Sequence, residues 1–490
     1  MKRSLRLTLA AAFVLLVMAV STAAASAAVY IPTKTADTAD GACNADCSLR
    51  EAVLAANAKP GDDVILLRPG VYLLSLAGNE NLGATGDLDV QDDLVIVGSG
   101  ASSTIIDGDG IDRLFEVPSG LTLELRDVTL RNGRAQTGGA ILNQGETTIL
   151  RSVLSGNFST AGFGGAILTN GQNASLNVAD STLASNTAQG GGGAIAAGGE
   201  VELDNLTVSG NRSVADHGGG LYVFADARTA VNNATIVANT AGLSGGGIFA
   251  EVSAFVGFPP SVTNSIVAGN TAATSPDCAG DLESGYDLIG NGAGCLGPSA
   301  ARHDLVGTPA SPINPLVAPL AQNGGPTPTR ALAAGSPALN AGHPGTPGSG
   351  GDACAATDQR DASRPASNRC DIGAFEVTPA CVSGGSTICL GQNRFKVTAT
   401  WRKGLTALGA TLSNESGYFY FSSPGDVELT VKILNTCAAN GYYRFSAGGM
   451  TNLRVDITVT DTKTGATRTY RNPAGQPFRA IIDPSAFACP

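Results

Sequence analysis

A phrase that recurs about every 27 residues between Leu125 and Asn270 constrains this chain more than any other feature. Each copy is a short apolar run closing on Asn, a polar link, and then Gly-Gly before more apolar residues, as in SVLSGN…GGAIL. The second glycine of each pair is Gly139, Gly165, Gly193, Gly220 or Gly247. The asparagines are Asn132, Asn157, Asn186, Asn211, Asn239 and Asn270. Spacing this regular indicates stacked repeats, each packing against its neighbours.

The repeating unit is made of strands, because its apolar runs are short, β-branched and alternating, as in VELDNLTV. No helix of useful length fits between consecutive glycine pairs. Gly-Gly and Asn instead supply bends, since both tolerate left-handed backbone. We therefore predict an all-β fold, a right-handed parallel β-helix of the pectin-lyase type. The asparagine column is interpreted as an amide ladder between coils, with a ligand role as the alternative.

The ends of the chain differ from the repeat. Residues 1–28 read as a signal peptide, with Lys2, Arg3 and Arg6 before an apolar run and small residues at 25–27. No second apolar stretch long enough to span a membrane follows. We expect five parts: the signal peptide 1–28, an N-terminal cap with the first coils 29–125, regular repeats 126–277, irregular last coils with a C-terminal cap 278–378, and a β-sandwich 379–490.

Charge and cysteine content limit the function classes. The chain has 41 acidic and 30 basic residues, and no lysine occurs between Gly61 and Arg394. We therefore expect no nucleic-acid binding. In an exported protein, an even number of cysteines reads as disulfides, and nearest-neighbour pairing is the simplest choice. The expected pairs are Cys43–Cys47, Cys278–Cys295, Cys354–Cys370, Cys381–Cys389 and Cys437–Cys489. Zinc is the rival interpretation of such spacings, although no histidine neighbours these cysteines.

The stretch from Cys43 to Asn57 contains a helix start, because Ser48 and Glu51 form the pattern of a capping box. The apolar residues that follow fall on one face, so we predict a short helix that covers the open end of the β-helix. The words CSLREAVLAAN and GDDVILLRPGVYLL resemble the CSLREA domain found at the front of many exported bacterial β-helix proteins. The resemblance implies that the first coils follow this helix directly.

The segment DQRDASRPASNRCDIGAFE, from Asp358 to Glu376, resembles the ending known as a choice-of-anchor domain of type Q. The family form usually has Gly where this chain has Asp361, which would affect one turn. We expect this segment to finish the stack and cover its last edge. Beyond Thr378, segments such as VELTVKIL alternate at strand period and the only tryptophan, Trp401, appears. An antiparallel β-sandwich is predicted there.

One polar column runs in register with the repeat, five or six residues before the terminal asparagine. Its members are Asp127, Asp180, Asn205, Asn233 and Asn264. The functional interpretation is a stripe that binds sugar hydroxyls or a cation. The structural alternative is that Asp and Asn begin each strand because they suit the bend.

The best candidates for catalysis are Asp216, His217, Asp226 and Arg228, where a histidine, acids and an arginine come close in sequence. The structural alternative is an exposed loop. The DGDGID segment at Asp107–Asp112 hints at calcium but lacks the spaced ligands of an EF-hand loop, so no metal or other cofactor is predicted. Tyrosines of the last part, and Trp401, could stack on sugars, but most are expected in the sandwich core.

Fold alone does not settle function, and β-helices include polysaccharide lyases and hydrolases. We expect a secreted or cell-surface protein with a non-catalytic adhesion or glycan-binding role, whose partner is an extracellular polysaccharide or surface glycan. The alternatives are a polysaccharide lyase or glycoside hydrolase, and a purely structural envelope component. The oligomeric state is not predicted.

Overall fold

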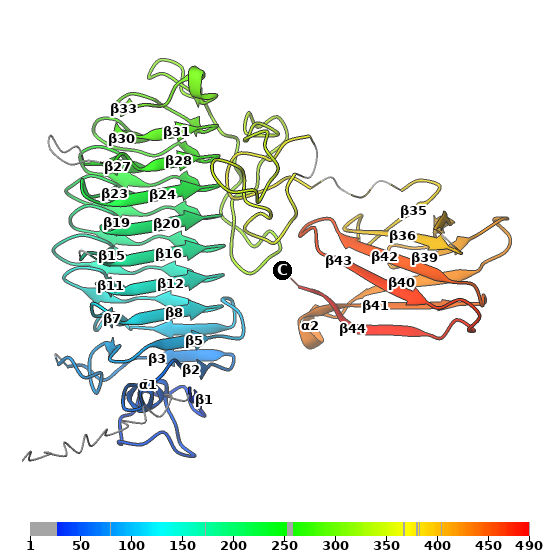
Figure 1. Cartoon of the computed structure of the whole chain (residues 1–490), viewed down its shortest axis with the longest axis horizontal. Helices are drawn as coiled ribbons and strands as arrows, with labels where there is room; N and C mark the ends of the chain where they lie inside the picture. The colour runs from blue at the N-terminus through cyan, green and yellow to red at the C-terminus, as the bar shows by residue number, and fades with distance from the viewer. Residues whose placement is uncertain are drawn as a thin grey trace, which may run out of the picture.

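The computed structural model describes residues 27–489, apart from 79, 172, 252–257, 366–367, 379–380, 382 and 403. Residues 1–26 of the predicted signal peptide lie outside this range. The described chain forms a right-handed parallel β-helix followed by a region of antiparallel sheets, so the predicted fold class is confirmed (Figure 1). No helix among the described residues has the length and apolar character needed to cross a membrane.

Each regular coil contributes one strand to each of three long parallel sheets. Sheet 1 contains β1 (Val29–Tyr30), β2 (Asp63–Leu66), β5 (Leu94–Val97), β8 (Thr122–Arg126), β12 (Glu146–Leu150), β16 (Ser175–Ala179), β20 (Glu200–Asp204), β24 (Arg228–Asn232), β28 (Ser261–Thr263) and β31 (Glu283–Gly285). Sheet 2 contains β3 (Gly70–Leu73), β6 (Thr104–Asp107), β9 (Thr129–Arg131), β13 (Val153–Ser155), β17 (Thr182–Ala184), β21 (Thr207–Ser209), β25 (Thr235–Val237), β29 (Ile266–Ala268), β32 (Leu288–Ile289) and β34 (Leu305–Val306).

Sheet 3 closes the coil opposite the bend that joins sheets 1 and 2. It contains β4 (Leu88–Asp89), β7 (Phe115–Val117), β11 (Ile141–Asn143), β15 (Ile167–Thr169), β19 (Ile195–Ala197), β23 (Leu221–Val223), β27 (Ile248–Ala250), β30 (Cys278–Asp281) and β33 (Cys295–Leu296). A fourth, short sheet lies between sheets 2 and 3. It contains β10 (Arg134–Ala135), β14 (Phe158–Ser159), β18 (Thr187–Ala188), β22 (Arg212–Ser213) and β26 (Thr240–Ala241).

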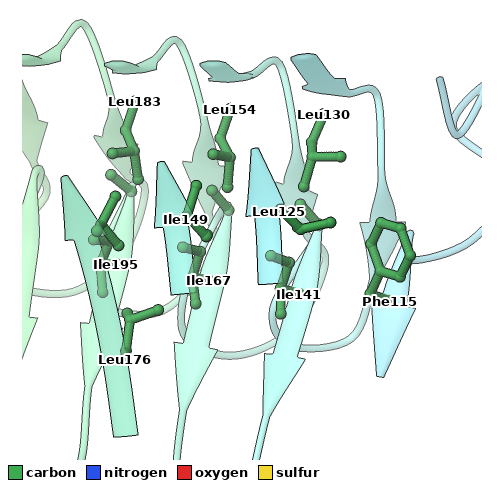
Figure 2. Packing of buried hydrophobic residues seen from close by; sticks show 14 of the residues in the cluster. Phe115, Leu125, Leu130, Ile141, Ile149, Leu154, Ile167, Leu176, Leu183 and Ile195 are labelled. Carbon is green, nitrogen blue, oxygen red and sulfur yellow. The ribbon is translucent and has the colours of Figure 1, made fainter. Parts of the chain in front are cut away.

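The interior of the stack is filled by aliphatic side chains that repeat in register. Leu125 pairs with Ile149 in sheet 1, and Leu130 pairs with Leu154 in sheet 2. These side chains are fully buried and point into the coil, as Figure 2 shows. Burial of each such side chain stabilises the fold by about 1.5–3 kcal/mol, so each coil depends on the coils above and below it.

The asparagine ladder is present, one coil shorter than predicted. Asn157 donates from its side-chain nitrogen to Asn186 Oδ1 at 2.9 Å, and Asn186 donates to Asn211 in the same way. The series continues through Asn239 and Asn270 and ends on Asp277 Oδ1 at 2.9 Å. Asn132 does not belong to it.

Gly133 holds the ladder position in that coil, where its N–H donates to Asn157 Oδ1. Asn132 itself has φ of +56°, which matches Gly156 and Gly210 in the later coils. The repeat is therefore offset by one residue there, because Asn replaces Gly at the left-handed bend.

The helix α1 (Leu49–Asn57) covers the first coil with the predicted capping box, in which Ser48 and Glu51 each accept the other's backbone N–H. Its apolar side chains join the interior core of the stack. Arg50 is fully buried and donates to Asp37 and to the carbonyl oxygens of Gly83 and Gly86. This arginine fixes the helix to the chain that enters the first coil of sheet 3.

The last part of the chain forms two antiparallel sheets around a common core that includes Phe395, Phe419 and Phe445. One sheet contains β35 (Thr387–Leu390), β36 (Phe395–Trp401), β37 (Leu405–Thr406), β42 (Val455–Asp461) and β43 (Thr467–Asn472). The other contains β38 (Leu408–Thr411), β39 (Ser416–Tyr420), β40 (Leu429–Asn435), β41 (Tyr442–Gly449) and β44 (Ile481–Ala488). Two further short helices are the 3-10 turn Ala300–Arg302 and α2 (Cys437–Asn440).

The ten cysteines form the five predicted disulfides. The pairs are Cys43–Cys47, Cys278–Cys295, Cys354–Cys370, Cys381–Cys389 and Cys437–Cys489. All five connect residues within one part of the chain, so none links the β-helix to the antiparallel sheets.

Candidate functional site

The predicted polar column lies at the bend between sheets 1 and 2. Asp127, Asp180, Asn205, Asn233 and Asn264 all have left-handed backbone, with φ between +50° and +58°. The predicted column has no member in the coil between Asp127 and Asp180. Arg151 occupies the equivalent left-handed position there, and it pairs with Asp127 at 2.7 Å. Asp and Asn tolerate this conformation better than other residues with side chains, so the bend selects them.

Most of this column is covered by the chain itself. The segment 307–376 runs back along the side of the stack beside sheet 2, where Figure 1 shows it in yellow-green. Asn233 Oδ1 accepts from the N–H of Ala355 at 2.8 Å, and Asn264 donates to the carbonyl of Asp352 at 2.8 Å. Asn205, Asn233 and Asn264 are consequently buried and offer no open face to a ligand.

This docking accounts for the polar and charged side chains of the segment from Asp358 to Glu376. The Gln359 side chain is fully buried and donates to Thr182 Oγ1 at 2.9 Å, while its oxygen accepts from Thr207 Oγ1 at 2.6 Å. Arg364 pairs with Glu376 at 3.1 Å. Asp361 has φ of +66°, a left-handed conformation that glycine adopts most readily. We expected this segment to cover the end of the stack, but its contacts are with the sides of the coils from β17 to β29.

The four catalytic candidates do not meet. Asp216 and His217 lie in the link before β23, whereas Asp226 and Arg228 follow that strand at its other end, and no contact joins the two pairs among the described residues. The Arg228 guanidinium lies over Phe258, 4.3 Å from the ring centroid. His217 Nδ1 lies 2.6 Å from Ser244 Oγ, and its Nε2 lies 3.7 Å from Asp216 Oδ1.

His217 instead belongs to a group of aromatic side chains on the outer face of sheet 3. We call this group the aromatic cluster; it consists of Phe163, His217, Tyr222, Phe224 and Phe249. His217 stacks on Phe249 with ring centroids 4.2 Å apart, and Tyr222 lies 5.0 Å from Phe249 and 5.1 Å from Phe163. Phe224 completes the group at 5.0 Å from Tyr222. Apart from Tyr222, the members are partly exposed.

The strand register creates the cluster from residues far apart in sequence. Tyr222 and Phe249 are paired at the central, outward position of β23 and β27. Phe163 reaches them from a link two coils away, across the glycine run that precedes β19. A Cβ atom on Gly191 would lie 2.4 Å from the Tyr222 ring, so the ring rests directly on this backbone. The glycine run before β19 could have indicated from the sequence that a bulky group packs against the backbone there. Only the strand register shows that this group is the Tyr222 ring.

The same outward column becomes acidic at the N-terminal end of the stack. Tyr222 follows Ala196, Leu168, Leu142, Glu116 and Asp89 down the column. Glu116, Asp89 and Asp87 bring carboxylate oxygens within 4.8 Å of one another and could offer ligands to a cation. Arg113 already supplies a positive charge, at 3.0 Å from Asp87 and 2.5 Å from Glu116.

Burial dominates the electrostatics of that acidic end. It raises the pKa of Asp87 to about 6, although Arg113 opposes the change. Burial and the neighbouring Asp87 carboxylate raise the pKa of Asp89 to about 7. In the Asp107–Asp112 segment, Asp107 is paired with residues of the next coil, because it accepts from Arg131 at 2.6 Å and from Asn132 at 2.9 Å.

The aromatic residues of the antiparallel sheets mainly pack among themselves. Trp401 stacks on Phe421 at 4.5 Å, and Tyr443 lies against Phe395 at 4.9 Å. Tyr442 is more open, with 41% of its surface exposed. Tyr418 and Tyr420, at alternate half-buried positions of β39, lie with their ring centroids 6.3 Å apart.

Comparison with known proteins adds little to this geometry. No family model matches the chain, and no curated protein matches it. Among solved structures, Geobacillus virus E2 ORF18 aligns over 87% of this chain and 69% of that chain, with 9% sequence identity and a TM-score of 0.19. A likeness at this level carries no information about function.

Proposed function

We propose that the protein is a non-catalytic, extracellular or surface-associated protein that binds a glycan through the outer face of sheet 3. The aromatic cluster is the observation that carries this proposal. Aromatic faces offer sugars a flat apolar surface, and an apolar patch with a polar rim is typical of an interaction site. Here the rim includes Asp216, Ser244 and Glu251.

The location outside the cell is part of the same proposal. Five disulfides persist most readily in an oxidising compartment, and the predicted signal peptide would direct the chain there. The resemblance to exported CSLREA proteins with a choice-of-anchor type ending supports the same assignment. An adhesive role for the protein as a whole follows from glycan binding combined with a long, rigid stack.

The test measures retention of the mature chain on a glycan array, followed by titration with the best ligand. Tyr222→Ala should weaken binding at least about tenfold, because aromatic residues at the centre of a contact contribute most of the energy. Tyr418→Ala, on β39 of the antiparallel sheets, is the matched control and should change affinity less than about twofold. Equal affinities for the Tyr222→Ala variant and the unchanged chain would contradict the proposal.

The enzymatic alternative is tested on the same samples by release of reducing ends from acidic and neutral polysaccharides, with and without calcium. We expect no release, because the two pairs of candidate residues, Asp216 with His217 and Asp226 with Arg228, do not converge on one point. Release that His217→Ala abolishes would replace the binding function with a lyase or hydrolase. Loss of a general base would slow such a reaction by roughly 10²–10⁴-fold.

A further inference from the structure

The rim of the aromatic cluster carries two acidic side chains, Asp216 and Glu251, and the histidine nearest to Asp216 is His217, at 3.7 Å. Burial, and then the charges of Glu251 and Asp216, raise the pKa of the Tyr222 hydroxyl to about 12. Glu251 is exposed and accepts only a long hydrogen bond from the N–H of Ala225, at 3.4 Å. Asp216 has 30% of its side chain exposed. Among the described residues, no arginine or lysine forms an ion pair with either carboxylate.

Tyr222 is buried within the aromatic cluster, and its hydroxyl lies near the carboxylates of Glu251 and Asp216. A phenol held against two carboxylates keeps its proton, so it can donate to a ligand oxygen. Each carboxylate can only accept, and it therefore favours a ligand with N–H donors or a positive charge. The polar groups around the aromatic faces thus select a ligand that combines hydroxyl oxygens with ammonium groups.

A further acidic residue, Glu116, lies on the same outward column, where it pairs with Arg113. Glu116 lies four coils from Tyr222, about 19 Å at one strand spacing per coil. Only Leu142, Leu168 and Ala196 occupy the outward positions between them. A linear polymer that follows this column would pass from the aromatic cluster over small and aliphatic side chains toward a second acidic region.

We propose that the ligand is a polymer of amino sugars with free, protonated amines, rather than a uronic-acid or neutral polysaccharide. This inference rests on the proposed glycan-binding function. Sugar faces lie on the partly exposed rings of Phe163, Phe224 and Phe249, which the buried Tyr222 ring supports, while ammonium groups lie against Asp216 and Glu251. A uronic acid would place its carboxylate beside these two acids, and the repulsion would weaken its binding.

The experiment compares three oligosaccharides of equal length by calorimetric titration of the mature chain: glucosamine, N-acetylglucosamine and galacturonic acid oligomers. Affinity should be highest for the glucosamine oligomer, about tenfold above its N-acetylated counterpart at low salt, and the difference should shrink in high salt. Glu251→Gln and Asp216→Asn should each reduce that ratio about three- to tenfold. Binding of the N-acetylated oligomer should stay within twofold in both variants.

Two controls separate the possible failures. Glu202→Gln removes the same charge from an exposed position of β20 in sheet 1, and it should leave the ratio unchanged. Binding that depends on Tyr222 but shows no preference for free amines would overturn the charge inference and leave glycan binding in place. No binding of any oligomer would overturn both. Polylysine that binds as tightly as the glucosamine oligomer, without dependence on Tyr222, would show a general cation surface and overturn the assignment to sugars.

Discussion

The carboxyl group of Asp89 lies on the outward column of sheet 3, where the next coil carries Glu116 and the following coils carry apolar or aromatic side chains. Only 4% of Asp89 is exposed, and the one hydrogen bond to its carboxylate comes from the N–H of Gly83 at 2.7 Å. Arg113 pairs with Asp87 and Glu116 but makes no ion pair with Asp89. The pKa of Asp89 is raised for these reasons, and the protonated form is favoured in the folded state.

The pKa of Asp89, raised from 3.8 to about 7, predicts a specific pH dependence of stability. Between these values the folded state holds a proton that the unfolded state has lost, so stability falls as pH rises through that window. Asp89→Asn removes this loss, since the amide stays neutral at every pH. From pH 4 to pH 8, the free energy of unfolding of the variant should rise relative to the unchanged chain by on the order of 1–3 kcal/mol.

Urea unfolding followed by circular dichroism at several pH values measures this difference. Asp226→Asn is the control, because Asp226 is an exposed carboxylate in the turn after β23. Its stability should run parallel to that of the unchanged chain across the range. A constant gap between the Asp89→Asn variant and the unchanged chain would show that Asp89 is ionised when folded.

At the scale of the coil, the sequence was enough to predict the elements. The apolar period placed Leu125, Leu130 and Ile141 in the interior, and the glycine pairs marked the entry to sheet 3. The outward positions were harder to predict, since an exposed strand position accepts almost any residue. Phe163 and Tyr222 are separated by two coils of sequence, so their contact depends on a register that no local pattern encodes.

The amide ladder makes each coil's stability depend on its neighbours. Asn211→Ala would remove the acceptor of both the backbone N–H and the side chain of Asn186, and it would also remove the side-chain donor to the carbonyl of Leu183. These groups are buried away from water, so we expect a loss of about 2–4 kcal/mol in the free energy of unfolding. Asn170→Ala, at an exposed position after β15, should cost less than about 0.5 kcal/mol.

Hydrogen exchange would locate the Asn211→Ala effect as well as measure it. Backbone amides of the coils that carry Asn186 and Asn239 should exchange faster than those near α1. Equal melting curves for the two asparagine variants would contradict an energetic role for the ladder.

At the scale of the whole molecule, the segment 307–376 joins the stack to the antiparallel sheets. Its position could not be predicted from the sequence, because it lacks periodicity and its partners are distant in sequence, as Gln359 and Ser181 are, 178 residues apart. The motif from Asp358 to Glu376 could be identified in the sequence. Its role in docking to the stack becomes clear only from the structure, in which Gln359 bonds to both β17 and β21. Arg360 then donates to the backbone carbonyl of Lys463, in the turn between β42 and β43 of the antiparallel sheets.

Gln359→Ala should release this segment from the side of the stack. The substitution leaves Thr182 and Thr207 facing a cavity and breaks the hydrogen bonds from the Gln359 amide, for an expected loss of about 2–4 kcal/mol. Proteolysis within the Gly- and Pro-rich stretch 342–352 should become faster, and backbone amides at the bends beside Asn205 and Asn233 should lose protection from exchange.

Gln322→Ala, at an exposed position of the same segment, is the matched control and should change neither measurement. Because Cys354–Cys370 closes the motif on itself, its local fold should survive while its docking is lost. Unchanged exchange at these bends in the Gln359→Ala variant would show that the remaining contacts, led by Arg364 with Asn205, hold the segment in place without it.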